Sequence, residues 1–229
     1  AGIGSNGDIR ITGGEITVSA EGLGAAIGGY AGVDCGNITI QGNVIKSVIS
    51  SGAGACIGGA SNRSAGSITI SNAKLPPLNG TSLIGWIRGN TAGSLTIRNC
   101  YIESTDTAAG SGIQVSDNGN IRIENSEVKL PEKRDIRAGD GGSIVIRDST
   151  IHSNGIYMLG NLNEAKSLKR LEITGSTVVT AGNVIGAMGS RASVDEIVIH
   201  GSSLSPAEGA DHYYAIGGGE YASLSLIHI

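Results

Sequence analysis

Short stretches of alternating hydrophobic and polar residues recur along almost the whole chain. The first runs from Asp8 to Ala20, where Ile9 and Ile11 alternate with polar residues before a Gly-Gly pair and a second alternating stretch. A hydrophobic residue at every second position is typical of a β-strand with one buried face. The pattern therefore predicts a unit of two short strands joined by a sharp turn.

The same unit occurs eight times, at intervals of 23 to 30 residues. Its first hydrophobic position is filled by Ile9, Ile38, Ile68, Leu95, Ile121, Ile144, Leu171 and Ile197. In every repeat, further aliphatic residues lie two and seven positions after this one. A third hydrophobic segment with a looser register follows, as in Ala25–Gly29 and Ala55–Gly59. Each repeat thus predicts three short strands.

One position of the repeat indicates where the chain turns. Four residues after the first hydrophobic residue, the chain has Gly13, Gly42, Asn72, Asn99, Asn125, Asp148, Gly175 and Gly201. These residue types tolerate the left-handed αL conformation, which costs other residues about 1–2 kcal/mol. We therefore expect an αL corner at all eight positions, and a ladder of stacked amides where three asparagines follow one another.

Three strands in a repeat of about 27 residues predict a solenoid. A single repeat has too little hydrophobic surface to fold alone, so neighbouring repeats must stack to bury it. Gly, Ser, Thr and β-branched residues fill the strands, which argues against helical repeats. We predict an all-β chain that forms one right-handed parallel β-helix of about eight coils, because parallel crossovers are almost always right-handed.

Two segments depart from the repeat. The longest loop, residues 160–170, has room for a turn of helix. At the end of the chain, His228 occupies the position where a corner residue is expected, and Leu224–Ile229 reads like a translated sequencing adapter. We expect residues 1–223 to form the β-helix domain, as part of a longer protein, and residues 224–229 to be a non-native tail.

Composition narrows the classes of function. The net charge is −4 and the basic residues are scattered, so no nucleic-acid partner is expected. No run of about 18 hydrophobic residues is present, so we expect no membrane span in this segment. Cys35, Cys56 and Cys100 fit no zinc motif, and small buried residues are the favoured interpretation over a disulfide plus one free thiol. We expect no cofactor.

The repeat resembles the right-handed β-helix repeats of the pectin-lyase-like superfamily. The eightfold strand–corner–strand unit carries this resemblance, and the segments Ala25–Gly29 and Asn37–Ile40 look most like repeat-rich surface proteins of gut-type bacteria. The resemblance implies a bacterial protein that is secreted or held at the cell surface. It does not imply one activity, because the superfamily includes pectate lyases and polygalacturonases as well as non-catalytic adhesins.

The residues that such enzymes use are only partly matched. Glycosidase chemistry requires two or three carboxylates close together. The nearest matches to polygalacturonase motifs lie around Asp106, Asp135 and His152, and none reproduces its motif. A calcium-dependent lyase would need aspartates that converge on neighbouring coils. Asp106, Asp117, Asp135 and Asp140 occupy different positions in their repeats, so we expect neither convergence nor a metal site.

Contact with carbohydrate is the activity that the third segment favours. Trp86 and Tyr157 would offer aromatic faces to sugar rings, and Gln114 and Arg137 lie in equivalent segments. We predict these four residues as ligand contacts. The favoured function is a non-catalytic structural or adhesin-type surface module that contacts glycans or a host surface. The alternative is a polysaccharide-degrading enzyme that uses Asp106, Asp135 and His152.

Overall fold

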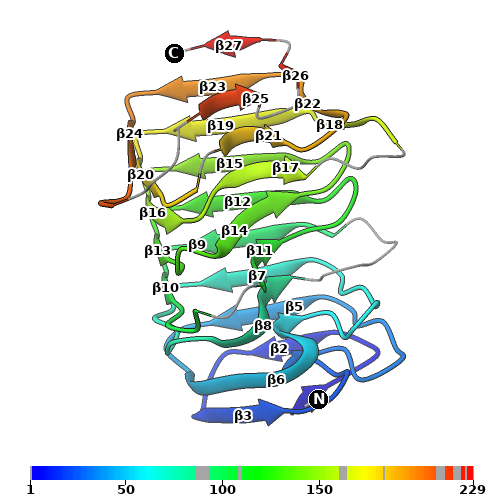
Figure 1. Ribbon diagram of the computed structural model, residues 1–229. Coiled ribbons are helices and arrows are strands. Elements are labelled where there is room, and N and C mark those ends of the chain that lie inside the picture. Colours follow the sequence, from blue (N-terminus) through cyan, green and yellow to red (C-terminus); the bar gives the residue numbers. More distant parts are fainter. Residues whose placement is uncertain are drawn as a thin grey trace.

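The computed structural model describes the following residues: 2–85, 93–107, 110–159, 164–182, 184–209, 215–218, 223–224 and 226–228. Within these ranges every regular element is a β-strand, and neighbouring strands pair in parallel (Figure 1). The same ranges contain no helix that is long and apolar enough to cross a membrane.

The chain winds into a parallel β-solenoid of about 7 turns with about 27 residues per turn. Figure 1 shows the strands stacked from the N-terminal end to the C-terminal end, so that equivalent strands of successive repeats lie side by side. The eight first strands counted along the sequence enclose seven full turns. The predicted all-β solenoid is therefore confirmed.

The first sheet contains the first strand of each repeat. Its strands, in spatial order, are β2 (Ile9–Ile11), β5 (Ile38–Gln41), β7 (Ile68–Ser71), β9 (Leu95–Arg98), β12 (Asn120–Glu124), β15 (Ser143–Arg147), β19 (Arg170–Thr174), β23 (Ile197–His200) and β27 (Ile227–His228). The register stacks equivalent aliphatic residues, as in the pairs Ile121–Ile144 and Ile123–Ile146. These four side chains are completely buried, so the alternating pattern of the sequence corresponds to one inner face.

The second and third strands form two further sheets. The second sheet contains β10 (Tyr101–Glu103), β13 (Glu127–Lys129), β16 (Thr150–Ser153), β20 (Thr177–Thr180) and β24 (Ser203–Pro206). The third contains β1 (Ile3–Gly4), β4 (Ile27–Gly28), β6 (Ile45–Gly58), β8 (Asn79–Gly85), β11 (Gly110–Gln114), β14 (Arg134–Ala138), β17 (Ile156–Leu159), β21 (Val184–Met188) and β25 (Ala215–Gly218), with β3 (Ile16–Ala20) paired to β6. Near the N-terminal end, the second and third strands of one repeat are continuous and form the single 14-residue strand β6.

A short fourth sheet forms in the last coils, from β18 (Lys166–Leu168), β22 (Ala192–Val194) and β26 (Ser223–Leu224). The sequence had suggested a turn of helix in residues 160–170. Instead, the described part of this loop forms strand β18, because Leu168 stacks on Val194 and both are completely buried.

The described part of the predicted tail continues the stack. Ile227 pairs with Ile197 in the first sheet, whereas Leu224 pairs with Val194 in the fourth. The assignment of residues 224–229 to a non-native tail stays a prediction.

The αL corners lie at seven of the eight expected positions, with φ between 46° for Asn125 and 82° for Gly42. In the first repeat the corner is one residue later than predicted, at Gly14, where φ is 84°. Two adjacent glycines tolerate this conformation equally, so the sequence pattern could not choose between Gly13 and Gly14. One step of the predicted amide ladder is present, because Asn99 Nδ2 donates to Asn72 Oδ1 at 3.0 Å.

The interior is aliphatic and includes all three cysteines, which are buried and unpaired. Burial raises the pKa of the Cys56 thiol to about 12, so this thiol is protonated at neutral pH. The prediction of three small buried residues is confirmed.

Candidate functional site

A group of polar side chains lies on the third sheet, where β11, β14 and β17 are neighbours. The register places Gln114 beside Arg137 and Arg137 beside Tyr157, in one row across three coils. Ser111 lies on β11 and Asp135 lies on β14, whereas Asn154 lies in the segment before β17. We call Ser111, Gln114, Asp135, Arg137, Asn154 and Tyr157 the polar cluster.

Arg137 is the partly exposed centre of the polar cluster. Its Nε donates to Gln114 Oε1 at 2.8 Å, and its Nη2 donates to Ser111 Oγ at 2.5 Å. Two neighbours on the adjacent strand therefore fix the plane of the guanidinium. The guanidinium also interacts with the Tyr157 hydroxyl, so Arg137 contacts both neighbouring strands.

Tyr157, Asp135 and Asn154 form the buried side of the polar cluster. Tyr157 Oη donates to Asp135 Oδ2 at 2.6 Å, and Asn154 Nδ2 donates to Asp135 Oδ1 at 2.7 Å. Burial raises the pKa of the Tyr157 phenol, and the charge and hydrogen bond of Asp135 raise it further. The phenol is therefore a stable donor to Asp135 at neutral pH.

The exposure of Tyr157 differs from the expectation. Tyr157 is only 3% exposed, so its ring does not offer the open aromatic face that the sequence suggested. A Cβ placed on Gly155 would lie 2.9 Å from the Tyr157 ring, which shows that the ring packs over this glycine. Ligand contact by Tyr157 stays a prediction.

The strand pattern explains why these side chains meet. On β14, residues Arg134, Ile136 and Ala138 face inward, whereas Asp135 and Arg137 face the other side because side chains alternate along a strand. On β11 the register shifts between Ser111 and Ile113, so that Gly112 is an additional residue opposite β14. Such a bulge changes the direction of the neighbouring side chain.

Asp106 lies apart from the polar cluster, against Arg134. The guanidinium of Arg134 is completely buried, and its Nη2 lies 2.9 Å from Asp106 Oδ2. The same carboxylate oxygen accepts a hydrogen bond from the Gly80 backbone N–H at 3.2 Å. Asp106 therefore serves as a structural acceptor between coils in this structure.

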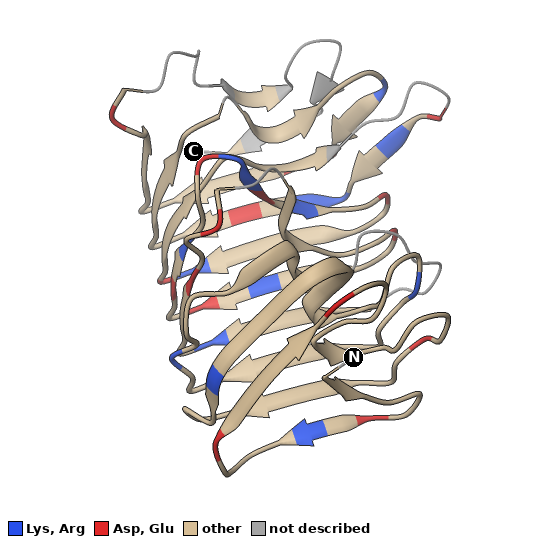
Figure 2. Ribbon diagram, turned by 60° about the horizontal axis from the view of Figure 1, so that its bottom comes forward, with Lys and Arg blue, Asp and Glu red and all other residues tan. Residues whose placement is uncertain are grey.

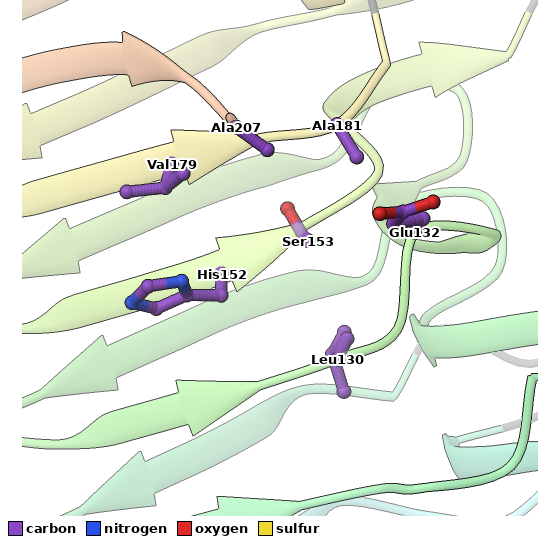
Figure 3. A pocket seen from close by; sticks show the side chains of 7 residues that line it. All are labelled: Leu130, Glu132, His152, Ser153, Val179, Ala181 and Ala207. Atoms are coloured by element: carbon purple, nitrogen blue, oxygen red, sulfur yellow. The ribbon is translucent and has the colours of Figure 1, made fainter. Parts of the chain in front are cut away.

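His152 lies on β16, in the second sheet, and lines a shallow open pocket of about 120 Å³. Figure 3 shows the seven side chains around this pocket, which are Leu130, Glu132, His152, Ser153, Val179, Ala181 and Ala207. Most of the lining is aliphatic. Asp106, Asp135 and His152, the catalytic candidates of the enzyme alternative, are thus engaged in three separate environments.

The structure brings together three of the four residues that the sequence predicted as ligand contacts. Gln114, Arg137 and Tyr157 are brought together in one row, and Asp135 joins them. Trp86 lies outside the described residues. Ser111 and Asn154 were missed, although their places beside the third strands of neighbouring repeats would have suggested them.

A network of ion pairs on the outer face of the first sheet was also missed. Arg98 and Arg122 both pair with Glu124, and Arg147 and Arg170 both pair with Glu172. Arg170 also contacts Glu196. The signal was present, because Arg98, Glu124 and Arg147 occupy the same repeat position with alternating charge. Figure 2 shows positive and negative residues interspersed over the described chain, without a broad region of one sign.

Asp117 and Asp140 lie in neighbouring turns of the solenoid. The backbone N–H of Asp140 donates to Asp117 Oδ1 at 2.9 Å, and Lys166 Nζ lies 3.1 Å from Asp117 Oδ2. Both aspartates lie in turns that stack before the first strand, and Asp140 Oδ1 accepts a hydrogen bond from the Ser167 backbone N–H at 2.7 Å. The expectation that the aspartates do not converge on a metal site stays a prediction. Among the described residues, no group of three or more His, Cys, Asp or Glu side chains is arranged to hold a metal ion.

Comparisons with known proteins agree with the architecture. A family model described as "Right handed beta helix region" matches residues 28–204, which is more than half of the chain. Searches of curated proteins and of solved structures found no match.

Proposed function

The chain belongs to the right-handed β-helix family, and from this premise we propose that it is a non-catalytic structural module that contacts carbohydrate through the polar cluster. The β-helix is the scaffold, and Gln114 and Arg137 are the primary contacts. Trp86 stays a predicted contact. Secretion or display at a bacterial surface, with glycans or a host surface as the partner, is part of the same proposal.

The Arg137–Gln114 pair is the observation that carries this proposal. A guanidinium and a side-chain amide lie side by side on neighbouring coils, both partly exposed and joined at 2.8 Å. Guanidinium and amide groups are chemical types that hydrogen-bond to the hydroxyl groups of sugars. Because their partners already hold them, binding would cost little side-chain entropy.

The engagement of the carboxylates supports a non-catalytic role. Asp135 accepts hydrogen bonds on both oxygens, and Asp106 is paired with the buried Arg134. A glycosidase needs one carboxyl group that protonates the leaving group and a second that acts as a base or nucleophile. Both aspartates are instead held by hydrogen bonds within the scaffold.

Polysaccharide binding by affinity electrophoresis tests the proposal. The panel should include a neutral β-glucan, a galactomannan, polygalacturonate, hyaluronan and mucin. We expect retardation by at least one polymer, and its loss in Gln114→Ala/Arg137→Ala. Arg122→Ala is the matched control, because it removes a partly exposed arginine from the first sheet. Binding that is equal in all three proteins, or absent from the panel, contradicts the proposal.

The enzyme alternative is tested with the same polymers by release of reducing ends and by absorbance of unsaturated products. We expect no turnover. Turnover that disappears in Asp106→Asn/Asp135→Asn would establish the polysaccharide-degrading enzyme instead.

A further inference from the structure

We infer that the buried Arg134–Asp106 pair is a positioning device that orients Arg137 through Ser111. The inference deepens the proposed function, on which its biological meaning rests, because it explains how one member of the polar cluster is held. It also gives Asp106 a role that involves no contact with ligand.

Arg134 connects three coils from inside the solenoid. Its Nη2 contacts Asp106 Oδ2 at 2.9 Å and its Nε donates to the Asp106 carbonyl at 3.4 Å. Its Nη1 donates to two further carbonyls, of Thr81 at 3.0 Å and of Ser111 at 3.2 Å. The rigid fork of an arginine suits this arrangement, since one planar group can address acceptors on several strands.

Ser111 needs such support because it lies beside the bulge at Gly112. There the register between β11 and β14 shifts, whereas the pairing of β11 with β8 on the other side stays regular, so the irregularity lies on the side that faces Arg137. Gly112 also has no room for a side chain, because a Cβ would lie 2.6 Å from the Asp135 carbonyl oxygen. The Arg134 guanidinium holds the Ser111 carbonyl at this irregular point.

Ser111 passes this constraint to Arg137. The Ser111 carbonyl faces Arg134, and its hydroxyl accepts the hydrogen bond from Arg137 Nη2 at 2.5 Å. A displacement of Ser111 would therefore move the hydroxyl that, together with Gln114, fixes the guanidinium plane of Arg137. The path consists of direct contacts only: Asp106, Arg134, Ser111 and Arg137.

The location of the pair is consistent with this role. A buried ion pair is a weak source of stability, because both groups lose their hydration. The register partner of Arg134 on the preceding coil is Gly110, and the residue alongside it on the following coil is Asn154, so neither neighbour carries a charge. A completely buried arginine that contacts Ser111, a member of the polar cluster, indicates a role in local geometry.

Hydrogen exchange of the Arg137 Nε–H, followed by NMR, tests the inference without any ligand. This proton is hydrogen-bonded to Gln114, and we expect its exchange to accelerate about tenfold or more in Asp106→Asn and in Arg134→Lys. Ser111→Ala, which leaves Arg134 and Asp106 in place, should accelerate it as well. The backbone amides of Ile121 and Ile123 report whether the core remains folded.

Glu124→Gln is the matched control, because it removes a carboxylate that pairs with Arg98 and Arg122 on another sheet. A merely structural loss would lower the melting temperature in the control and test variants alike, without a selective change at Arg137. If Asp106→Asn does not fold, Arg134→Lys carries the same comparison, since it keeps a positive charge beside Asp106.

Unchanged Arg137 exchange in a folded Asp106→Asn or Arg134→Lys protein would overturn the inference. The outcome is independent of polysaccharide binding. If hydrogen exchange accelerates selectively at the Arg137 Nε–H but the protein binds no polysaccharide, the positioning role stands and the proposed function is removed. Unchanged exchange at Arg137 together with polysaccharide binding would remove the positioning role and leave the proposed function standing.

Discussion

Individual glycines determine how closely the coils approach one another. Gly58 follows Ile57 in the third sheet and has φ of 140°. A Cβ at this position would lie 1.9 Å from the carbonyl oxygen of Gly85 on the next coil. The Ile-Gly-Gly segments of the first repeats are therefore required by backbone contact between coils.

Replacing Gly58 by alanine should destabilise the protein by about 3 kcal/mol or more, or prevent folding, because backbone must move to admit the methyl group. Gly13→Ala is the control, since no atom lies within 4 Å of a Cβ there and φ is not positive. We expect the control to change the free energy of unfolding by less than about 0.5 kcal/mol. Urea unfolding of both variants measures this difference, and equal stability would contradict the role of Gly58.

The αL corners give a second prediction at the residue scale. Asn125 has φ of 46°, so Asn125→Ala should lower the free energy of unfolding by about 1–2 kcal/mol. Asn125→Gly should stay within about 0.5 kcal/mol of the original protein, because glycine adopts this conformation without strain. Urea denaturation distinguishes the two, and a loss for glycine that equals or exceeds the loss for alanine would contradict the importance of the αL conformation at this corner.

At the scale of elements, a column of serines joins the first and second sheets. It follows the corner residues: the backbone N–H groups of Ser126, Ser149 and Ser176 each donate to the hydroxyl of the next serine in the column at 3.1 Å, ending at Ser202. Each hydroxyl donates in turn to the carbonyl two residues before it. The column satisfies backbone donors at a bend where sheet pairing is interrupted.

Replacing one serine tests how much this column of hydrogen bonds contributes to stability. Ser149→Ala takes away the acceptor of the Ser126 N–H and the donor to the Arg147 carbonyl, and should cost about 1–3 kcal/mol. Ser149→Cys should cost less, because Cys100 fills the equivalent position and contacts the Arg98 carbonyl at 3.1 Å. Thermal unfolding followed by circular dichroism compares the two, and equal losses would contradict the column as a source of stability.

The ion pairs of the first sheet make stability depend on pH. Hydrogen bonds from Arg122 lower the pKa of Glu124; burial opposes this effect and a hydrogen bond from Arg98 adds to it. Because the folded-state pKa is lowered, the stabilisation is present above the ordinary glutamate pKa of about 4.3 and is lost as the pH falls through the folded-state value. Its size should be about 1 kcal/mol or less, since the arginines are partly exposed.

The difference in melting temperature between the original protein and Glu124→Gln, measured from about pH 7 down to about pH 2, tests this dependence. The original protein should be the more stable near neutrality, and the difference should vanish at the acid end. A difference that is constant over the whole range would mean that the carboxylate charge does not contribute.

At the scale of the whole molecule, the fold could be predicted from residues that recur in every repeat, whereas the polar cluster depends on residues that occur in single repeats. The hydrophobic period and the corner residues occur eight times along the chain, so they predicted the solenoid, its register and seven of its eight αL corners. The polar cluster depends on single coils, on the bulge at Gly112 and on the buried Arg134, none of which a repeat reveals. The burial of Tyr157 was missed for the same reason, because it depends on packing over Gly155.

This difference has a physical origin. Periodic positions stabilise every coil in the same way, so neighbouring repeats confirm one another. A contact between Asp106 and Arg134 spans 28 residues and occurs once. The sequence places such residues on neighbouring coils without indicating which side chains meet. The function that we propose therefore depends on residues at which the regular scaffold is interrupted.

The most direct test of this account compares polysaccharide binding by Gln114→Ala/Arg137→Ala with binding by Arg122→Ala, using affinity electrophoresis on the polymer that retards the original protein. We predict that the double substitution in the polar cluster abolishes retardation and that the first-sheet control retains it. Retention by both variants, or loss in the control alone, would contradict the claim that the polar cluster is the carbohydrate-contacting site.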